Sequence, residues 1–434
     1  MTIGRPALTM WAILIATSYA AGQPPPRPEF RTLYSFQGTG DGNNPLENLS
    51  ISADGVLYGT ASYAPILANG VVFSLTPPPA EGGAWKETVV HVFLNGSEGN
   101  AAGWVLIGKD GALYGNTFGG GIFKRPCSSA GCGTVFLLTS PVSSEGPRIE
   151  TVLHRFTSYP LDGAYPMGPL AMNSNGVLYG VTSGGGAADQ GTVFQVTPPA
   201  TAGGAWIEKI IHNFSGNAAG GLPTAGVVIG DGGLLYGTTE YGGISSPNCL
   251  TGGCGTVFSL TPPAAAGEPW AEEVLHNFTG GSDGNQPYLG LTIGAGGVLY
   301  GTTQNGGSGS GSVFSLTPPL SPGGAWTDTL LYAFAGGNDG YEPRTPVVIG
   351  PGGLLYGLTA AGAPPCVCGT VYSLTPPSSP GGAWTHTVLH SFTGAPAEGS
   401  IVFAALAIGK NGVLYGATSE GGTANMGTVF ALKP

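Results

Sequence analysis

One phrase recurs seven times along this chain: a Leu-Tyr-Gly step, a glycine-rich loop, and Thr/Ser-Val-Phe/Tyr or a close variant. The tyrosines of the Tyr-Gly step are Tyr58, Tyr114, Tyr179, Tyr236, Tyr300, Tyr356 and Tyr415. They lie 56 to 65 residues apart. Such a period indicates a repeat architecture, in which each copy buries its apolar surface against the next copy. For a chain of 434 residues it favours one domain over two or three.

Each copy predicts four short strands, as residues 286–334 show. An apolar run at 288–293 turns at Gly-Ala-Gly-Gly and returns over 298–303. A glycine-rich loop leads to a third run at 312–317, and a proline-containing turn leads to a fourth run that ends at Phe334. Turn residues between apolar runs are typical of an antiparallel meander. We name the four strands a, b, c and d.

The phase of the repeat predicts how the chain closes. The first strand, residues 31–36, is a lone d strand, and the last, 428–432, is a c strand. An open stack would leave both as unpaired edges, which favour aggregation. If these two strands pair, seven four-stranded antiparallel blades form a closed ring. We therefore predict an all-β fold, a seven-bladed β-propeller spanning residues 30–434.

The N-terminus predicts secretion. Arg5 precedes an apolar run at 7–16, and Ser18 and Ala20 are suitably small for positions −3 and −1 of a cleavage site. We interpret residues 1–20 as a signal peptide and 21–29 as a proline-rich linker. A secreted or periplasmic location, without a membrane partner, is expected.

Composition argues against nucleic acid as a partner. Only 9% of residues are charged, and 13 Lys and Arg stand against 24 acidic residues, for a net charge of −11. A nucleic-acid binder needs a basic face to neutralise phosphates. The expected partner is a carbohydrate or a protein ligand, and the expected oligomeric state is a monomer.

Three close cysteine pairs occupy the loop between strands b and c: Cys127 with Cys132, Cys249 with Cys254, and Cys366 with Cys368. In an oxidising compartment, local disulfides are the usual outcome. The pair one residue apart would form a small strained ring and is the weakest of the three. Two thiolates per loop do not supply the four ligands of a metal centre, so no metal site is predicted.

An acidic residue followed by glycine comes five or six positions after the phenylalanine that ends strand d. These residues are Asp41, Glu98, Asp162, Asp283, Asp339 and Glu398, with Ala219 as the exception. One interpretation is a repeated Asp-Gly turn. The other is an acidic collar around the channel mouth that binds calcium or a cationic ligand. No other cofactor is expected.

At two further positions of the repeat, the same residue type recurs in most copies. We call each such set a column and interpret both as structural. Histidine stands two positions before the strand-d phenylalanine at His91, His154, His212, His276 and His390, with Tyr34 and Tyr332 completing the column. Tryptophan opens strand d at Trp85, Trp206, Trp270, Trp326 and Trp384. These rings could stack on sugars, but packing of the hairpin over the blade edge is favoured.

The repeat resembles a known family. The matching text is Gly-x-Leu-Tyr-Gly-Thr-Thr, the Gly-Gly loop, Gly-Thr-Val-Phe-x-Leu-Thr-Pro, and Val-Leu-His-x-Phe followed by Asp-Gly-x-x-Pro. It is similar to the Gloeo/Verruco tandem repeat of the choice-of-anchor GloVer-containing proteins, over residues 30–434. The resemblance implies a secreted bacterial β-propeller without an assigned activity.

The sequence supports two functional hypotheses. The first is a non-enzymatic binding propeller that presents its loop-rich face, because loops on a rigid scaffold usually carry binding. The alternative is an extracellular polysaccharide hydrolase or lyase with its active site at the channel mouth. That alternative requires ionisable groups to converge there, from the acidic residues or from Lys109, Lys124 and Arg344.

Overall fold

The computed structural model describes residues 27–46, 48–61, 70–94, 96–127, 129–140, 148–201, 203–249, 252–265, 267–321, 323–362, 366–379 and 381–434. The predicted signal peptide and most of the predicted linker lie outside the described residues. Within the described residues, regular structure consists of β-strands and four single 3₁₀ turns. The 3₁₀ turns are η1 (Asp231–Gly233), η2 (Ala295–Gly297), η3 (Gly337–Asp339) and η4 (Pro351–Gly353).

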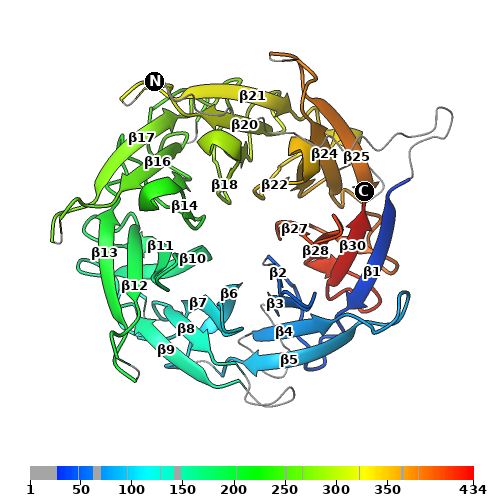
Figure 1. The fold of residues 1–434 in the computed structure, drawn as a ribbon, viewed down its shortest axis with the longest axis horizontal. Coiled ribbons are helices and arrows are strands. Elements are labelled where there is room, and N and C mark those ends of the chain that lie inside the picture. Colours follow the sequence, from blue (N-terminus) through cyan, green and yellow to red (C-terminus); the bar gives the residue numbers. More distant parts are fainter. Residues whose placement is uncertain are drawn as a thin grey trace, which may run out of the picture.

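The strands form seven four-stranded antiparallel sheets arranged as blades of a ring (Figure 1). Blade 1 contains β2 (Ser50–Ile51), β3 (Leu57–Ala61), β4 (Val71–Thr76) and β5 (Lys86–Val92). Blade 2 contains β6 (Asn100–Ile107), β7 (Leu113–Gly119), β8 (Thr134–Leu138) and β9 (Glu150–Arg155). Blade 3 contains β10 (Gly163–Met172), β11 (Leu178–Gly185), β12 (Thr192–Thr197) and β13 (Ile207–Asn213). Blade 4 contains β14 (Val228–Ile229), β15 (Leu235–Thr239), β16 (Thr256–Thr261) and β17 (Ala271–Asn277).

The remaining blades follow the same order. Blade 5 contains β18 (Leu291–Ile293), β19 (Leu299–Thr303), β20 (Ser312–Thr317) and β21 (Thr327–Ala333). Blade 6 contains β22 (Val348–Ile349), β23 (Leu355–Thr359), β24 (Thr370–Thr375) and β25 (Thr385–Ser391). Blade 7 contains β27 (Ala407–Ile408), β28 (Leu414–Thr418), β30 (Thr428–Lys433) and β1 (Glu29–Ser35), and a small sheet of β26 (Gly399–Ser400) and β29 (Glu420–Gly421) accompanies it.

The two ends of the described chain meet in blade 7, as the phase of the repeat predicts. Strand β1 pairs antiparallel with β30, so that Phe30 lies opposite Leu432 and Tyr34 opposite Val429. The sheet order is β1-β30-β28-β27, and the N-terminal strand therefore supplies the outer edge of the last blade. The predicted seven-bladed closed propeller is confirmed, and within the described ranges all four strands of every blade are paired.

The glycine of each Tyr-Gly step is required by packing. A Cβ atom placed at Gly180 would lie 2.5 Å from Cζ of Phe194 and 2.8 Å from Leu170. Equivalent approaches by the strand-c aromatic ring occur at the other six copies. The glycine of Leu-Tyr-Gly is therefore required because the aromatic ring of strand c packs directly against strand b, which leaves no room for a Cβ atom.

The core between blades is one aromatic contact repeated seven times. The phenylalanine that follows strand d meets the strand-c ring of the next blade edge to face, with centroids 5.0–5.2 Å apart and interplanar angles of 63–71°. The pairs are Phe36–Phe73, Phe93–Phe136, Phe156–Phe194, Phe214–Phe258, Phe278–Phe314, Phe334–Tyr372 and Phe392–Phe430. Edge-to-face pairs are favourable beyond their area burial. The junction that closes the ring, Phe36–Phe73, has the same geometry as the other six.

A second contact joins neighbouring blades at the hairpins between strands c and d. Each of the five tryptophans packs against the Tyr-Gly tyrosine of the preceding blade, with centroids 5.9–6.5 Å apart. In blade 2, Arg148 takes this position and lies over the Tyr58 ring at 5.4 Å. The packing interpretation of the tryptophans is confirmed, because these rings contact tyrosines of the neighbouring blade.

We predict that the closing junction stabilises the protein as much as an internal one. Phe36→Ala and Phe156→Ala should each lower the free energy of unfolding by about 3–5 kcal/mol, because each opens a cavity in an equivalent fully buried site. Urea titration followed by circular dichroism measures both. A loss below about 1 kcal/mol for Phe36→Ala alone would show that the N-terminal strand is not part of the cooperative fold.

Tyr372 offers a second test, since it is the one tyrosine among the seven strand-c rings. Its side chain is fully buried and its hydroxyl has no hydrogen-bond partner among the described residues. An unpaired buried hydroxyl costs stability, so Tyr372→Phe should raise the free energy of unfolding by about 1 kcal/mol. The reverse change in blade 5, Phe314→Tyr, should lower it by a similar amount. Destabilisation by Tyr372→Phe would contradict this account.

Candidate functional site

The histidine column lies at the junctions between blades. In five of the seven copies, the member contacts the residue that stands four positions before its counterpart on the outer strand of the next blade. Nε2 of His91 lies 3.3 Å from Glu150, and Nε2 of His212 lies 3.5 Å from Glu272. At the closing junction the His390 ring stacks on Phe30, with centroids 3.9 Å apart.

The residues that the histidines contact occupy one position of the outer strand and are mostly acidic, and we call them the acidic column. This column was not predicted from the sequence. Its members are Glu87, Glu150, Glu208, Glu272 and Asp328, with Phe30 and His386 completing it. Spacing alone could not reveal the contact, because a β-bulge in the outer strand turns Glu208 toward the preceding blade and His212 toward the next one. Burial raises the pKa of Glu87, Glu208 and Glu272 to about 7 and lowers the pKa of His212 to about 4. At the junction between His212 and Glu272, burial therefore favours the uncharged forms of both partners.

The predicted acidic residues lie beside their own outer strands. Asp162 accepts the Thr157 N–H at 2.8 Å and lies 3.2 Å from His154, and Asp283, Asp339 and Glu398 repeat this arrangement. Asp41 accepts from the Tyr34 hydroxyl and from the Gln37 N–H, each at 2.8 Å. For Glu98, the backbone carbonyl accepts from Thr134 at 3.1 Å.

These contacts bring five of the six carboxylates to a histidine or tyrosine of their own blade. The outer strands run along the perimeter of the ring, so five of the six predicted residues lie there and not at the channel mouth (Figure 1). The densest group joins His154 to two carboxylates, Asp162 after its own strand and Glu208 on the next blade. The side-chain atoms of these three residues that could bind a metal ion all lie within 4.8 Å of one another. Cation binding by these acidic residues stays a prediction.

The three cysteine pairs are joined as disulfides, with Cα atoms 5.1–5.2 Å apart. Each disulfide lies in the loop between strands b and c, directly before the glycine that opens strand c. Cys127 and Cys132 are buried in the core cluster of blades 2 and 3. These loops and the crossovers between strands d and a occupy the same face of the ring, because strands alternate in direction within a blade.

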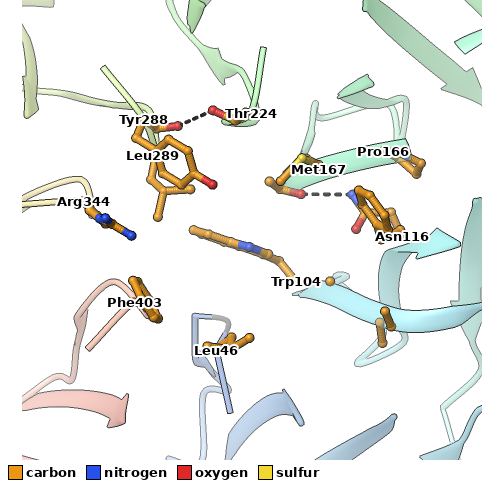
Figure 2. Close-up of a pocket in the computed structure, with 15 residues that line it drawn as sticks. Leu46, Trp104, Asn116, Pro166, Met167, Thr224, Tyr288, Leu289, Arg344 and Phe403 are labelled. Carbon is orange, nitrogen blue, oxygen red and sulfur yellow. Dashed lines mark hydrogen bonds between the residues drawn. The ribbon is translucent and has the colours of Figure 1, made fainter. Parts of the chain in front are cut away.

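A cavity of about 470 Å³ opens in the centre of the ring and is lined from all seven blades (Figure 2). Seven of its fifteen lining residues come from one position of the repeat, twelve residues before the Tyr-Gly tyrosine. The residues at this position are Leu46, Ala102, Met167, Thr224, Tyr288, Arg344 and Phe403. All seven are different, although the scaffold positions of the same repeats are nearly identical. Of these seven residues, Arg344 alone was predicted from the sequence as a candidate for the channel mouth.

Backbone geometry directs these side chains to the axis. In every repeat a non-glycine residue just before this position has a positive φ, between 47° and 58°. These residues are Asn44, Ala101, Tyr165, Leu222, Gln286, Glu342 and Ile401. Bulky and β-branched residues pay a steric cost in the left-handed region, so the surrounding packing must hold the kink. The kink turns the chain from the crossover into the innermost strand.

Trp104 fills the axis beneath this cavity. At its position, ten residues before the tyrosine, the other repeats carry Asn48, Pro169, Gly226, Gly290, Pro346 and Ala405. Trp104 is thus a large ring at a position where the other six repeats carry smaller residues. Trp104 lines both the 470 Å³ cavity and a second cavity of about 250 Å³ that includes Pro169 and Pro346. Its indole therefore stands between the two.

Arg344 is the charged residue in the wall of the larger cavity. Its Nη2 donates to Glu342 at 2.8 Å, and its guanidinium lies 5.3 Å from the centre of the Phe403 ring. Its Nε is buried without a hydrogen-bond partner among the described residues. Burial raises the pKa of nearby Glu240, against a hydrogen bond from Tyr241 and the charge of Arg344.

The other two predicted cations do not reach this cavity. Lys109 donates to the Ser174 carbonyl at 3.1 Å, and both residues lie in turns between strands a and b on the opposite face. Lys124 is exposed in the loop between strands b and c of blade 2. An aromatic pair extends the cavity outward instead: Phe118 is 40% exposed and stacks on Tyr165, with ring centroids 5.1 Å apart.

Fold and site together define a β-propeller with a ligand-sized cavity at one mouth of its central channel. The chain belongs to the Gloeobacter/Verrucomicrobia repeat family, whose model matches residues 23–251 and 246–434. The resemblance seen in the repeats is thus confirmed. No curated protein matches the chain.

Solved structures share the fold at low identity. The extracellular domain of a protein from B. thetaiotaomicron, described as a one-component system, aligns with a TM-score of 0.53 and 11% identity over 93% of this chain and 41% of that one. PorZ, a surface component of the type-IX secretion system of Porphyromonas gingivalis, aligns with a TM-score of 0.49 and 13% identity over 92% and 47%. This chain therefore spans less than half of either protein, and the likeness shows the fold alone.

No helix among the described residues has the length and apolar character needed to cross a bilayer.

The electrostatics of the blade junctions generate a pH prediction. The Glu272 pKa is raised to about 7 by burial, so its stabilising protonated form is fully present below its ordinary value of 4.5 and is lost as pH rises through 7. From pH 5 to pH 8 the wild type should lose about 1–2 kcal/mol more unfolding free energy than Glu272→Gln. Urea titrations at several pH values measure this difference.

The control for this prediction is the neighbouring Glu273→Gln. Glu273 is exposed on the opposite face of β17, so this variant should follow the wild-type pH profile. His212 is present in all three proteins, so its own titration, with the pKa lowered to about 4, cancels in the comparison. Parallel profiles for the wild type and Glu272→Gln would show that Glu272 ionises normally in the folded protein.

Proposed function

We propose that this protein is a non-enzymatic binding propeller that takes a ligand into the cavity at the mouth of its channel. The observation that carries the proposal is the contrast within each repeat. Positions that build the blades hold the same residue in nearly every copy, whereas the seven residues around the mouth are all different. Duplication would have left them alike, so their divergence is typical of a site fitted to one ligand.

The cavity has the physical character of a ligand site. Its volume of about 470 Å³ lies within the usual range for small-molecule pockets. Aromatic walls come from Trp104, Tyr288 and Phe403, and a few polar groups, including Arg344 and Thr224, stand between them (Figure 2). An apolar wall supplies affinity, and sparse polar groups supply orientation.

The same geometry favours binding over the hydrolase or lyase alternative. Such an enzyme requires ionisable groups that converge on a scissile bond. Five of the six candidate carboxylates lie beside outer strands, and Lys109 lies on the opposite face. At the mouth, Arg344 is already paired with Glu342. A protein held by three disulfides suits a secreted or periplasmic location, which completes the proposal.

A ligand screen with a cavity-filling variant tests this function. Ligand-observed NMR would be run on the disulfide-bonded protein with a mixed library of saccharides, dipeptides, nucleosides and aromatic acids. Leu46→Trp places a bulky ring in the cavity wall and should weaken any hit by at least about tenfold. Leu320→Trp makes the same change on the fully exposed hairpin of blade 5 and should leave affinity unchanged. Hits that bind both variants equally, or a library without hits, would contradict the proposal.

A further inference from the structure

We infer that the ligand of this cavity is the end of an uncharged glycan chain, with its terminal ring in the cavity and its next ring on Phe118. This inference rests on the proposed binding function and names the ligand class for the same site. It is carried by the walls of the cavity, by its charge, by two unpaired polar atoms and by the aromatic path that leads outward.

The cavity walls suit a sugar ring. The apolar C–H face of a pyranose packs on aromatic rings, and its hydroxyl groups point outward around the rim. Trp104 forms the floor, and Tyr288 and Phe403 approach from blades 5 and 7, on other sides of the axis (Figure 2). Side chains of three blades thus offer apolar and aromatic surface around one cavity of about 470 Å³, which has room for a sugar ring.

Charge argues for a neutral ligand. The cavity wall contains one charged side chain, Arg344, and its guanidinium is already paired with Glu342 at 2.8 Å, with the Glu240 carboxyl nearby. An anionic ligand would have to compete with two carboxyl groups for this cation. A cationic ligand would face a guanidinium in the wall. Hydroxyl groups avoid both costs, because the planar pair offers a donor and an acceptor side by side.

Two buried polar atoms at the cavity wall are unpaired in the described part of the chain. They are Nε of Arg344, a donor, and Oδ1 of Asn116, an acceptor. Asn116 is 1% exposed, and its amide nitrogen is held by the Gly168 carbonyl at 3.0 Å. Buried polar groups are rarely left without a partner. A sugar hydroxyl carries both functions, but it can pair with these atoms only after Arg344 or Asn116 shifts, because neither atom has accessible surface.

The aromatic path out of the cavity indicates a chain and not a single sugar. Phe118 lines the cavity rim but is 40% exposed, and it stacks on Tyr165 with an interplanar angle of 23°. The equivalent residues of other blades include Ser183, Ala360 and Ser419. Blade 2 therefore supplies both the ring beneath the cavity, Trp104, and the ring outside it. A second sugar ring leaving the cavity over blades 2 and 3 would meet Phe118.

The first experiment presents the folded, disulfide-bonded protein to a printed array of neutral and uronate-containing glycans. Binding to neutral glycans is the expected result. A preference for uronate-containing glycans would overturn the neutral assignment. Absence of glycan binding, together with library hits that Leu46→Trp weakens, would overturn the glycan inference and leave the proposed binding function standing.

Calorimetry with the best neutral oligosaccharide and its terminal monosaccharide then assigns the residues. Phe118→Ser introduces the residue that blades 3 and 7 carry, and should weaken the oligosaccharide about tenfold while leaving the monosaccharide unchanged. Arg344→Met introduces the residue of blade 3 and should weaken both ligands.

Matched controls keep the result specific. Phe123→Ser alters another exposed phenylalanine of blade 2, and Arg31→Met alters an exposed arginine on the outer strand β1. Both should bind like the wild type. Equal weakening of the two ligands by Phe118→Ser would overturn the second-ring assignment. Unchanged affinity of Arg344→Met for both ligands would overturn the role of the Arg344–Glu342 pair.

Discussion

The edge-to-face contact between a strand-d phenylalanine and the strand-c ring of the next blade is the interaction on which this structure depends. It recurs at all seven junctions within a narrow range of distances, and it forces glycine after each tyrosine because the ring is seated against strand b. The stability of a closed ring depends on every junction between its blades. The N-terminal strand therefore matters as much as any internal strand, since it carries Phe36 to the last junction.

Repetition of this frame separates the residues that build the protein from those that can serve a ligand. The strands and junctions use the same side chains in each blade, so their geometry does not depend on any residue at the channel mouth. The mouth residues follow a strained backbone kink that the frame holds in place. Trp104, Tyr288, Arg344 and Phe403 are consequently free to differ, and a rigid rim of unlike side chains is what preorganised binding requires.

The perimeter is where most of the acidic residues that follow strand d make their contacts. The sequence places Asp162 and its counterparts in crossovers near the loop-rich face, which is correct, but the Asp162 side chain turns back to the backbone N–H of Thr157 and to His154. In the second acidic column, to which Glu208 and Glu272 belong, an acidic residue stands four positions before four of the five histidines. Its meaning depended on a neighbouring blade that lies about sixty residues away along the chain.

The sequence by itself determined the number of blades, the strand order and the manner of closure, because repeat period, turn residues and the phase of the two ends are local properties of the chain. The sequence also predicted that the tryptophans serve to pack the hairpin over the blade edge. Only the tertiary structure decided which residues share a site. Leu46 and Phe403 stand at opposite ends of the sequence, yet both line one cavity, because ring closure brings seven distant positions to a common axis. Periodicity identifies equivalent positions, whereas the axis at which they converge exists only in three dimensions.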